Sequence, residues 1–306
     1  MDYELGIIGA GPAGYSASIY AGRSGISAVT FDKMGGGGLA LITPKIENYA
    51  GFETISGAEL MEKMQKHANQ YADLKFLEEV SAITKKETKF TITTSNSTYA
   101  TKAIILAMGS EYRRLGVPGE GKFIGKGVSY CATCDGNFFK GKNVAVIGGG
   151  NSALVEAVFL QQVGCKKVTV IHRRDRLRAE KAYETEALEK GVNFYFNTHV
   201  EQIRGTEIVE SLELHDTDTG EKRFEPFEGV FISIGEIPQN EVAKQMKVNL
   251  DEKGYIVVDR QQRTNIRGVY AAGDITGGVR QVITAAAEGA VAALSSLEVL
   301  GKQYPY

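Results

Sequence analysis

The sequence predicts an α/β protein made of two three-layer domains, with the second domain inserted into the first. Two observations indicate the domain type: a short apolar strand runs into a glycine-rich turn and a helix near residue 9, and the same succession returns near residue 148. A third observation indicates the insertion, because a late strand ending in Gly273-Asp274 would complete the first domain. At 306 residues, the chain is long enough for about two such domains.

The first glycine turn lies between a predicted strand, Leu5–Ile8, and a predicted helix over residues 13–24. Its sequence, Gly9-Ala10-Gly11-Pro12-Ala13-Gly14, is the G-x-G-x-x-G pattern of Rossmann-like dinucleotide-binding units. Gly9 would allow the tight turn, Gly11 would let a pyrophosphate approach the backbone, and Gly14 would let the helix pack on the strand. Asp32 ends the second strand, where a carboxylate can bind ribose hydroxyls. A glycine turn that binds nothing is the alternative, and the combination of strand, helix and acid favours a dinucleotide site.

The middle of the chain carries two thiols in the segment Cys131-Ala132-Thr133-Cys134-Asp135. Thiols at this spacing can close a small disulfide loop, and one of them usually has a lowered pKa and attacks readily at neutral pH. Asp135 could carry protons to and from the sulfurs. Half of a zinc site, or two buried cysteines packed as small apolar residues, are the alternatives. Because the remaining Cys165 and the four histidines are isolated in the sequence, we expect no metal site.

A second glycine turn, Gly148-Gly149-Gly150-Asn151-Ser152-Ala153, begins a dozen or so residues after the thiols and favours the redox interpretation. The strand that follows its helix ends at Ile171, and the ribose-binding acid expected there is missing. In its place stands the basic segment His172-Arg173-Arg174-Asp175-Arg176-Leu177-Arg178. Guanidinium groups bind a 2′-phosphate that a carboxylate would repel, so this turn predicts NADP(H) rather than NAD(H). A solvated basic stretch that binds nothing is the alternative.

The Gly273-Asp274 strand end faces a predicted helix from about residue 281 and can hold a ribityl or phosphate oxygen. It would close the first nucleotide domain with residues from the far end of the chain. Segments rich in charge, glycine and proline, at 112–119 and 235–238, read as the linkers. We therefore expect one domain at 1–113 and 241–306, and the inserted domain at 114–240.

Composition excludes several classes of partner. The 35 lysines and arginines nearly balance the 37 aspartates and glutamates, so no strong field draws the protein to nucleic acid or to an anionic membrane. No uninterrupted apolar run approaches the ~20 residues of a membrane span. The N-terminus is acidic where a secretory signal needs positive charge. A catalytic pair of cysteines and no recognisable targeting segment favour a reducing cytoplasm.

Taken together, these motifs resemble those of bacterial-type (low-molecular-weight) thioredoxin reductases, and the similarity runs from about Leu5 to about Leu297. The combination of C-A-T-C-D-G with a nearby G-G-G-N-S-A is far more specific than the glycine turns alone. The resemblance implies non-covalent FAD in the discontinuous domain, NADPH in the inserted domain and a homodimer. It also implies that electrons pass from NADPH through FAD and a Cys131–Cys134 disulfide to thioredoxin.

The resemblance also assigns individual residues by their positions in these motifs. Cys131 and Cys134 would form the redox disulfide, with Asp135 as the acid. The residues that would contact FAD are Gly9, Gly11, Ala13, Gly14, Asp32, Asn48, Asp274, Arg280, Gln281 and Val282. The residues that would serve NADPH are Gly148, Gly150, Asn151, Ser152, Ala153, Arg173, Arg174 and Arg178.

Two other functions remain compatible with the sequence. A related flavoprotein could use the same dithiol on another redox protein, or could draw electrons from another donor. A non-catalytic nucleotide or redox sensor is the alternative from a different class, and the intact C-x-x-C with its adjacent acid argues against it. Turnover with NADPH and a disulfide dye would distinguish an enzyme from a sensor.

Overall fold

The computed structural model describes residues 2–43 and 45–303. The chain forms two compact units: one combines residues up to Glu111 with residues from Ile237 onward, and the other comprises Tyr112–Glu236. We expected the boundaries at 113/114 and 240/241, within a few residues of these crossings; the outermost residues of that expectation, 1 and 304–306, lie outside the described ranges. Which unit takes which nucleotide stays a prediction.

The first unit is built on a five-stranded parallel sheet with the strand order β18-β7-β1-β2-β3. Its strands are β1 (Leu5–Ile8), β2 (Ala28–Asp32), β3 (Asp73–Phe76), β7 (Ala103–Leu106) and β18 (Val269–Ala271). Every residue of β1, β7 and β18 is buried, as is typical of parallel strands that are covered on both faces.

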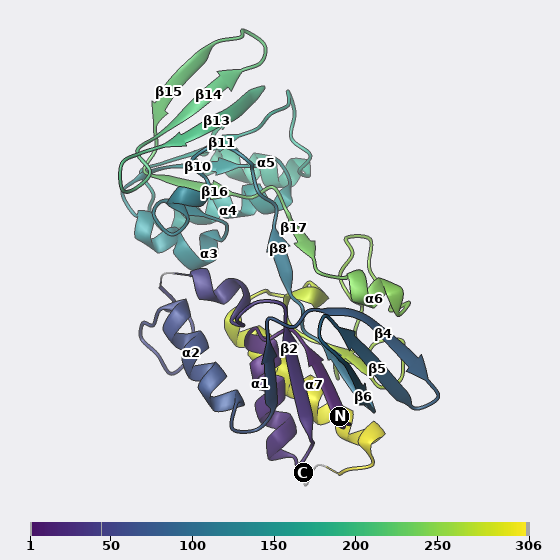
Figure 1. The fold of residues 1–306 in the computed structure, drawn as a ribbon. Helices are drawn as coiled ribbons and strands as arrows, with labels where there is room; N and C mark the ends of the chain where they lie inside the picture. Colours follow the sequence, from purple (N-terminus) through teal and green to yellow (C-terminus); the bar gives the residue numbers. More distant parts are fainter. Residues whose placement is uncertain (1, 44, 304–306) are drawn as a thin grey trace. The chain divides into compact units, whose positions relative to one another are not determined.

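Two different layers cover this sheet (Figure 1). Helices α1 (Pro12–Arg23) and α7 (Val282–Leu300) pack on one face, and α2 (Gly57–Ala68) packs against α1. On the other face lies an antiparallel sheet of β4 (Val80–Lys86), β5 (Lys89–Thr94) and β6 (Thr98–Thr101), together with α6 (Glu241–Gln245). The unit is therefore a three-layer α/β domain whose last strand and last helix come from the end of the chain.

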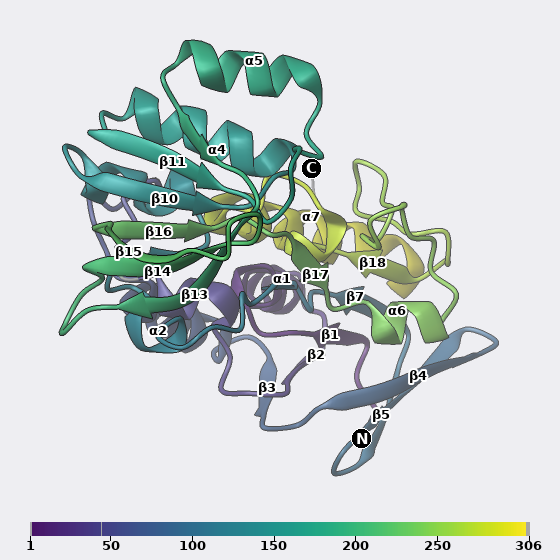
Figure 2. The same ribbon diagram turned by 90° about the horizontal axis from the view of Figure 1, so that it is seen from above.

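The second unit repeats this plan, with the strand order β12-β11-β10-β16-β9 in its parallel sheet. Helices α4 and α5 lie on one side of this sheet, and the antiparallel strands β13, β14 and β15 lie on the other (Figure 2). The parallel strands are β9 (Val128–Ser129), β10 (Asn143–Ile147), β11 (Lys167–Ile171), β12 (Asn193–Tyr195) and β16 (Gly229–Ile232). The covering elements are α3 (Ala132–Asp135), α4 (Asn151–Gln162), α5 (Lys181–Glu189), β13 (Thr198–Arg204), β14 (Ser211–Asp216) and β15 (Lys222–Pro226).

The chain crosses between the units through two short strands, β8 (Ser110–Tyr112) and β17 (Glu236–Pro238), which pair with each other. We expected residues 112–119 to be a linker, but all of them belong to the second unit. On the other side of the crossing, Lys33 Nζ donates to Glu111 Oε1 at 3.2 Å and to Gln239 Oε1 at 3.3 Å. The connection between the units is therefore shorter than the composition of residues 112–119 indicates.

Helix α7 contacts α1 at backbone distance. Gly289 is buried in the middle of α7, and a Cβ added there would overlap the carbonyl oxygen of Ala13. By length and composition alone, α7 would pass for a membrane span, although the sequence has no uninterrupted apolar run of that length. In this structure, its buried residues, among them Ala285, Ala292 and Leu297, belong to the core between the helices and the sheet.

This close approach predicts an inverted effect of a helix-favouring substitution. Gly→Ala inside an exposed helix normally stabilises a protein by about 1 kcal/mol. Because the added methyl group of Gly289→Ala must displace the Ala13 backbone, we expect it instead to lower the free energy of unfolding by about 1–3 kcal/mol. Denaturant unfolding measures the change.

The exposed neighbour Ala287 supplies the control on the same helix. Ala287→Gly should show the ordinary propensity cost of about 1 kcal/mol. If Gly289→Ala stabilises the protein, α1 and α7 are not in backbone contact.

Candidate functional site

The first glycine turn has one open position and two closed ones. A Cβ at Gly9 would overlap the Ala107 carbonyl group, and Gly9 has a φ of +103°, a conformation that favours glycine. A Cβ at Gly14 would overlap the oxygen of Gly9. A Cβ at Gly11 would meet no described atom within 4 Å, and no described side chain caps helix α1 at this end. Gly9 and Gly14 thus serve the packing, and Gly11 leaves room for a ligand beside unbonded N–H groups.

Asp32 has a role that the sequence did not indicate. Its carboxylate accepts hydrogen bonds from the backbone N–H groups of Ala10 at 2.9 Å, Met34 at 2.8 Å and Gly36 at 3.3 Å. It therefore ties the first glycine turn to the four-glycine loop at residues 35–38. A carboxylate can accept about four hydrogen bonds, so this arrangement leaves capacity for a ribose hydroxyl. The predicted ribose role remains compatible with this geometry.

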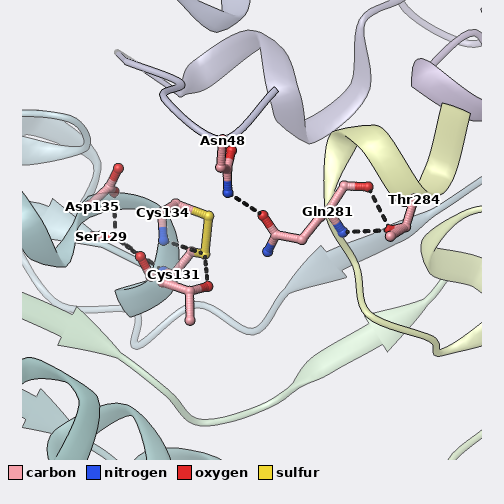
Figure 3. Close-up of a disulfide and its surroundings, with 8 residues drawn as sticks. Asn48, Ser129, Cys131, Cys134, Asp135, Gln281 and Thr284 are labelled. Carbon is pink, nitrogen blue, oxygen red and sulfur yellow. Dashed lines mark hydrogen bonds between the residues drawn. A yellow bond between two sulfur atoms is a disulfide. The ribbon is translucent and has the colours of Figure 1, made fainter. Parts of the chain in front are cut away.

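The start of α7 meets a loop that lies far from it in the sequence. Asn48 Nδ2 donates to Gln281 Oε1 at 2.9 Å (Figure 3), which brings together two of the residues predicted to contact a flavin. Gln281 is also the N-cap of α7, and its N–H donates to Thr284 Oγ1 at 3.2 Å. Arg280 has a positive φ of +56°, which is uncommon for residues other than glycine and recurs at ligand sites. Val282, the first residue of α7, packs against the core between α1 and α2.

The Gly273-Asp274 strand end lies next to the first glycine turn. A Cβ added to Gly273 would be 3.0 Å from the Cβ of Ala13. The N–H of Gly273 donates to Glu288 Oε2 at 2.7 Å, and burial raises the pKa of that glutamate. Glu288 has no recognisable signal in the sequence, because its role depends on α7 packing beside the strand end.

The second glycine turn reproduces the first. A Cβ at Gly148 would overlap the Ser233 oxygen and would lie 2.8 Å from the Cβ of Ala153, whereas one at Gly150 would have no neighbour within 4 Å in the described part of the chain. Asn151 is tied to the segment before α5: its Nδ2 donates to Glu180 Oε1, and its Oδ1 accepts from the Glu180 N–H, both at 2.9 Å. Ser152 is exposed in the first turn of α4.

The basic segment after β11 is anchored by its backbone and exposes its guanidinium groups. His172 is buried, and the Arg178 N–H donates to the Gly149 oxygen at 2.7 Å. Arg173, Arg174 and Arg178 are exposed, and none of them forms an ion pair with a carboxylate of residues 2–43 or 45–303. Burial lowers the pKa of His172, and the charges of Arg174 and Arg178 lower it further, so the histidine is neutral at pH 7. The arginines are therefore available to an anionic ligand beside the second turn.

Cys131 and Cys134 are joined by a disulfide with a Cα–Cα distance of 5.3 Å (Figure 3). The Sγ of Cys131 accepts a hydrogen bond from the Cys134 N–H at 3.2 Å and lies 3.3 Å from Thr133 Oγ1. Both groups can donate to a thiolate, so Cys131 has the better stabilised sulfur once the disulfide opens. The free cysteine, Cys165, is buried, which raises its pKa to about 11.

Asp135 lies beside the disulfide and is held by a serine that the motif search missed. Ser129 Oγ donates to Asp135 Oδ2 at 2.6 Å and accepts from the Cys131 N–H at 3.1 Å. Asp135 Oδ1 is buried and has no hydrogen-bond partner among the described residues. Burial raises the pKa of Asp135 against the lowering effect of the Ser129 bond, which suits a group that carries a proton to a nearby sulfur. Ser129 precedes Cys131 by two residues, but only the folded chain turns its hydroxyl group toward both partners.

Comparisons with known proteins agree with this geometry. The family model described as pyridine nucleotide-disulphide oxidoreductase matches residues 3–289. The chain is 43% identical to a thioredoxin reductase of Treponema pallidum over 95% of both chains, and 42% identical to one of Mycolicibacterium smegmatis over 98% of this chain and 97% of the relative. A solved thioredoxin reductase from Streptococcus pyogenes matches with a TM-score of 0.94 and 38% identity over 98% of both chains.

A thioredoxin reductase structure from T. acidophilum is 43% identical and matches with a TM-score of 0.66 over 97% of this chain and 98% of that one. These solved relatives confirm the predicted fold class of two Rossmann-like domains, one inserted into the other. The family match spans both glycine turns and the disulfide between them. The chain therefore belongs to the pyridine nucleotide-disulphide oxidoreductase family, within its thioredoxin reductases.

Proposed function

We propose that this enzyme passes electrons from NADPH through FAD and the Cys131–Cys134 disulfide to thioredoxin. One observation supports this most directly: the disulfide lies beside the half-buried Asp135, whose pKa is raised by burial, in a chain with two open glycine turns. We place the enzyme in the cytoplasm, because its dithiol must cycle in a reducing compartment. The homodimer implied by the family resemblance belongs to the same proposal.

The first unit would hold FAD without a covalent bond. The open space at Gly11 and the uncapped start of α1 suit a pyrophosphate, since no described atom lies within 4 Å of a Cβ added at Gly11. Bound FAD would supply a two-electron relay between nicotinamide and disulfide. The residues proposed to contact it are Gly9, Gly11, Ala13, Gly14, Asp32, Asn48, Asp274, Arg280, Gln281 and Val282.

The second unit would bind NADPH. Gly150 leaves the same open space as Gly11, and the exposed guanidinium groups of Arg173, Arg174 and Arg178 would supply paired donors for a 2′-phosphate. The residues proposed for this site are Gly148, Gly150, Asn151, Ser152, Ala153, Arg173, Arg174 and Arg178. Since this unit also carries the disulfide, NADPH and the disulfide would use the flavin in turn.

The two cysteines would divide the disulfide chemistry between them. Two electrons and two protons convert the disulfide to a dithiol, and Asp135 would supply and take up a proton at the sulfurs. Cys131, whose Sγ has the N–H and hydroxyl neighbours, would attack the disulfide of thioredoxin and form a mixed disulfide. Cys134 would then attack that bond, release reduced thioredoxin and restore the Cys131–Cys134 disulfide.

The arginine site predicts how the donor is selected. Each charge-assisted hydrogen bond to a 2′-phosphate contributes about 1.5–3 kcal/mol, so removing two should raise the KM for NADPH by at least about a hundredfold. We expect this for Arg173→Ala/Arg174→Ala in steady-state assays, with KM for NADH almost unchanged. Arg176→Ala, in the same exposed segment, should leave both constants unchanged. Equal losses with both nucleotides would contradict the 2′-phosphate role.

The proposed roles of the two cysteines predict that only one of the two single-cysteine variants forms a stable mixed disulfide with thioredoxin. In Cys134→Ser, Cys131 can attack an activated thioredoxin disulfide, and nothing resolves the product, so a stable mixed disulfide should accumulate. In Cys131→Ser, no stable mixed disulfide with thioredoxin should accumulate. Non-reducing electrophoresis and peptide mass spectrometry identify the linked cysteine. Both variants should lose turnover with NADPH and thioredoxin, and Cys165→Ser should retain it; a trap through Cys134 would reverse the assignment.

The raised pKa of Asp135 predicts opposite effects on activity and stability. Its proton is present below the folded-state pKa and is lost as the pH rises through it, so acid catalysis should decline on the alkaline side. Asp135→Asn keeps an acceptor for Ser129 but cannot transfer a proton, and turnover should fall about a hundredfold.

The same substitution should leave the protein at least as stable as the unsubstituted enzyme at neutral pH. The buried charge that destabilises the fold above the ordinary carboxyl pKa is absent in Asp135→Asn. Thermal unfolding and kcat/KM for thioredoxin, both measured against pH, check the two effects, with exposed Glu207→Gln as the control. An unchanged pH profile of turnover would exclude Asp135 as the acid.

A further inference from the structure

Glu120 is a buried carboxylate that the proposed electron transfer does not use. Only 5% of its surface is exposed. Its Oε1 accepts from the Leu115 N–H at 2.9 Å and from the Tyr130 hydroxyl at 2.6 Å, and its Oε2 accepts from the Gly116 N–H at 2.7 Å. A buried carboxylate with three donors is well satisfied, so Glu120 firmly joins the backbone of Leu115 and Gly116 to the side chain of Tyr130.

Tyr130, the residue before Cys131, is held on its ring as well as on its hydroxyl group. Its ring stacks on Tyr112 with centroids 4.8 Å apart and an interplanar angle of 11°. Arg114 Nη1 donates to the Tyr130 hydroxyl at 2.8 Å, and the guanidinium carbon lies 5.1 Å from the ring centroid. Burial and the bond to Glu120 raise the pKa of Tyr130 to about 12. The hydroxyl therefore keeps its proton and donates a hydrogen bond to Glu120.

The contacts of Tyr130 lie directly before Cys131, whose sulfur is proposed to attack thioredoxin. Strand β9 ends at Ser129, and Cys131 is still extended, with a φ of −144° and a ψ of 100°. Side chains alternate between the two faces of an extended segment. Tyr130 is bound to Glu120 and to residues 112–114, whereas Ser129 binds the Cys131 N–H and Asp135. Residues 129–131 are thus anchored on both faces, and Cys131 is the last residue of that anchored stretch.

We propose that Glu120 and Tyr130 are positioning residues for Cys131: they hold its backbone so that Sγ meets the disulfide of a docked protein in line. The proposal rests on the assignment of Cys131 as the attacking thiol. Attack on a docked partner requires a narrow range of distance and angle, whereas a small disulfide can approach a less well placed sulfur from many directions. Loss of the anchor should therefore slow attack on thioredoxin more than attack on a small reagent.

The second unit contains a matched tyrosine–glutamate pair that lies away from the cysteines. Tyr195 donates to Glu225 Oε1 at 2.5 Å, and Lys167 and Arg223 lie over its ring. Tyr195 belongs to β12, at the opposite edge of the sheet from β9. Tyr195→Phe therefore removes the same kind of hydrogen bond without touching the segment that leads to Cys131.

The test uses the Cys134→Ser holoenzyme, in which Cys131 reacts once. The Cys131 thiolate is mixed either with thioredoxin that carries thionitrobenzoate on one cysteine or with 5,5′-dithiobis(2-nitrobenzoate). In each reaction it forms a new disulfide and releases one thionitrobenzoate anion, whose absorbance gives the rate. Tyr130→Phe should slow the thioredoxin reaction about tenfold, which corresponds to about 1.4 kcal/mol, and change the small-reagent rate by less than about twofold.

Controls separate positioning from stability and from the function itself. Glu120→Gln should act in the same direction as Tyr130→Phe. Tyr195→Phe should change neither rate, even where it lowers the unfolding temperature as much as Tyr130→Phe does. Equal slowing of both reactions by Tyr130→Phe, or no slowing of either, would overturn the positioning role. Failure of the parent Cys134→Ser to join thioredoxin, with Tyr130 intact, would instead overturn the assignment of Cys131 and the positioning role with it.

Discussion

Backbone contact between α1 and its neighbours is the constraint on which the first unit depends. Gly14 brings α1 against the Gly9 carbonyl at the end of β1, and Gly289 brings α7 against the Ala13 carbonyl. These two contacts fix α1 between a strand at the beginning of the chain and a helix at its end. They also place Gly273 beside Ala13, so the open position at Gly11 lies next to a strand end contributed from some 260 residues away in sequence. Residues from both ends of the chain thereby meet at one end of the first unit.

The glycine turns of the two units have the same backbone arrangement, whereas the residues that follow the next strand differ in charge. In both, the first glycine of the turn is closed by packing, and a later one, Gly11 or Gly150, faces open space among the described atoms. After the second strand, the first unit has the carboxylate of Asp32 bonded inward to three N–H groups. The second unit has a buried neutral His172 followed by outward-facing arginines. In the proposed function, the turn would provide the phosphate site and the residue type at the strand end would select the nucleotide.

The environment of the disulfide is asymmetric, and the asymmetry matches the two tasks proposed for its sulfurs. Cys131 has hydrogen-bond donors at its Sγ and an anchored backbone, which suits a nucleophile that must meet a large partner. Asp135 is oriented by Ser129, and burial raises its pKa, which suits exchange of protons with the sulfur pair. The polar groups that create these differences lie within residues 129–135, but they act through contacts that only the folded segment makes.

By itself, the sequence determined the α/β class, the nested order of the two domains, and the residues of both turns and of the disulfide. It could do so because each of these depends on a local pattern: an apolar strand, glycines at fixed spacing and two cysteines three positions apart. It placed residues 112–119 in a linker, because glycine, proline and charge look alike in a free segment and in one bound to a buried carboxylate. Only the tertiary structure decided that Glu120 holds this segment to Tyr130, that Ser129 orients Asp135, and that Glu288 supports Gly273. Each of these contacts joins residues through space, and their partners are fixed by packing rather than by sequence spacing.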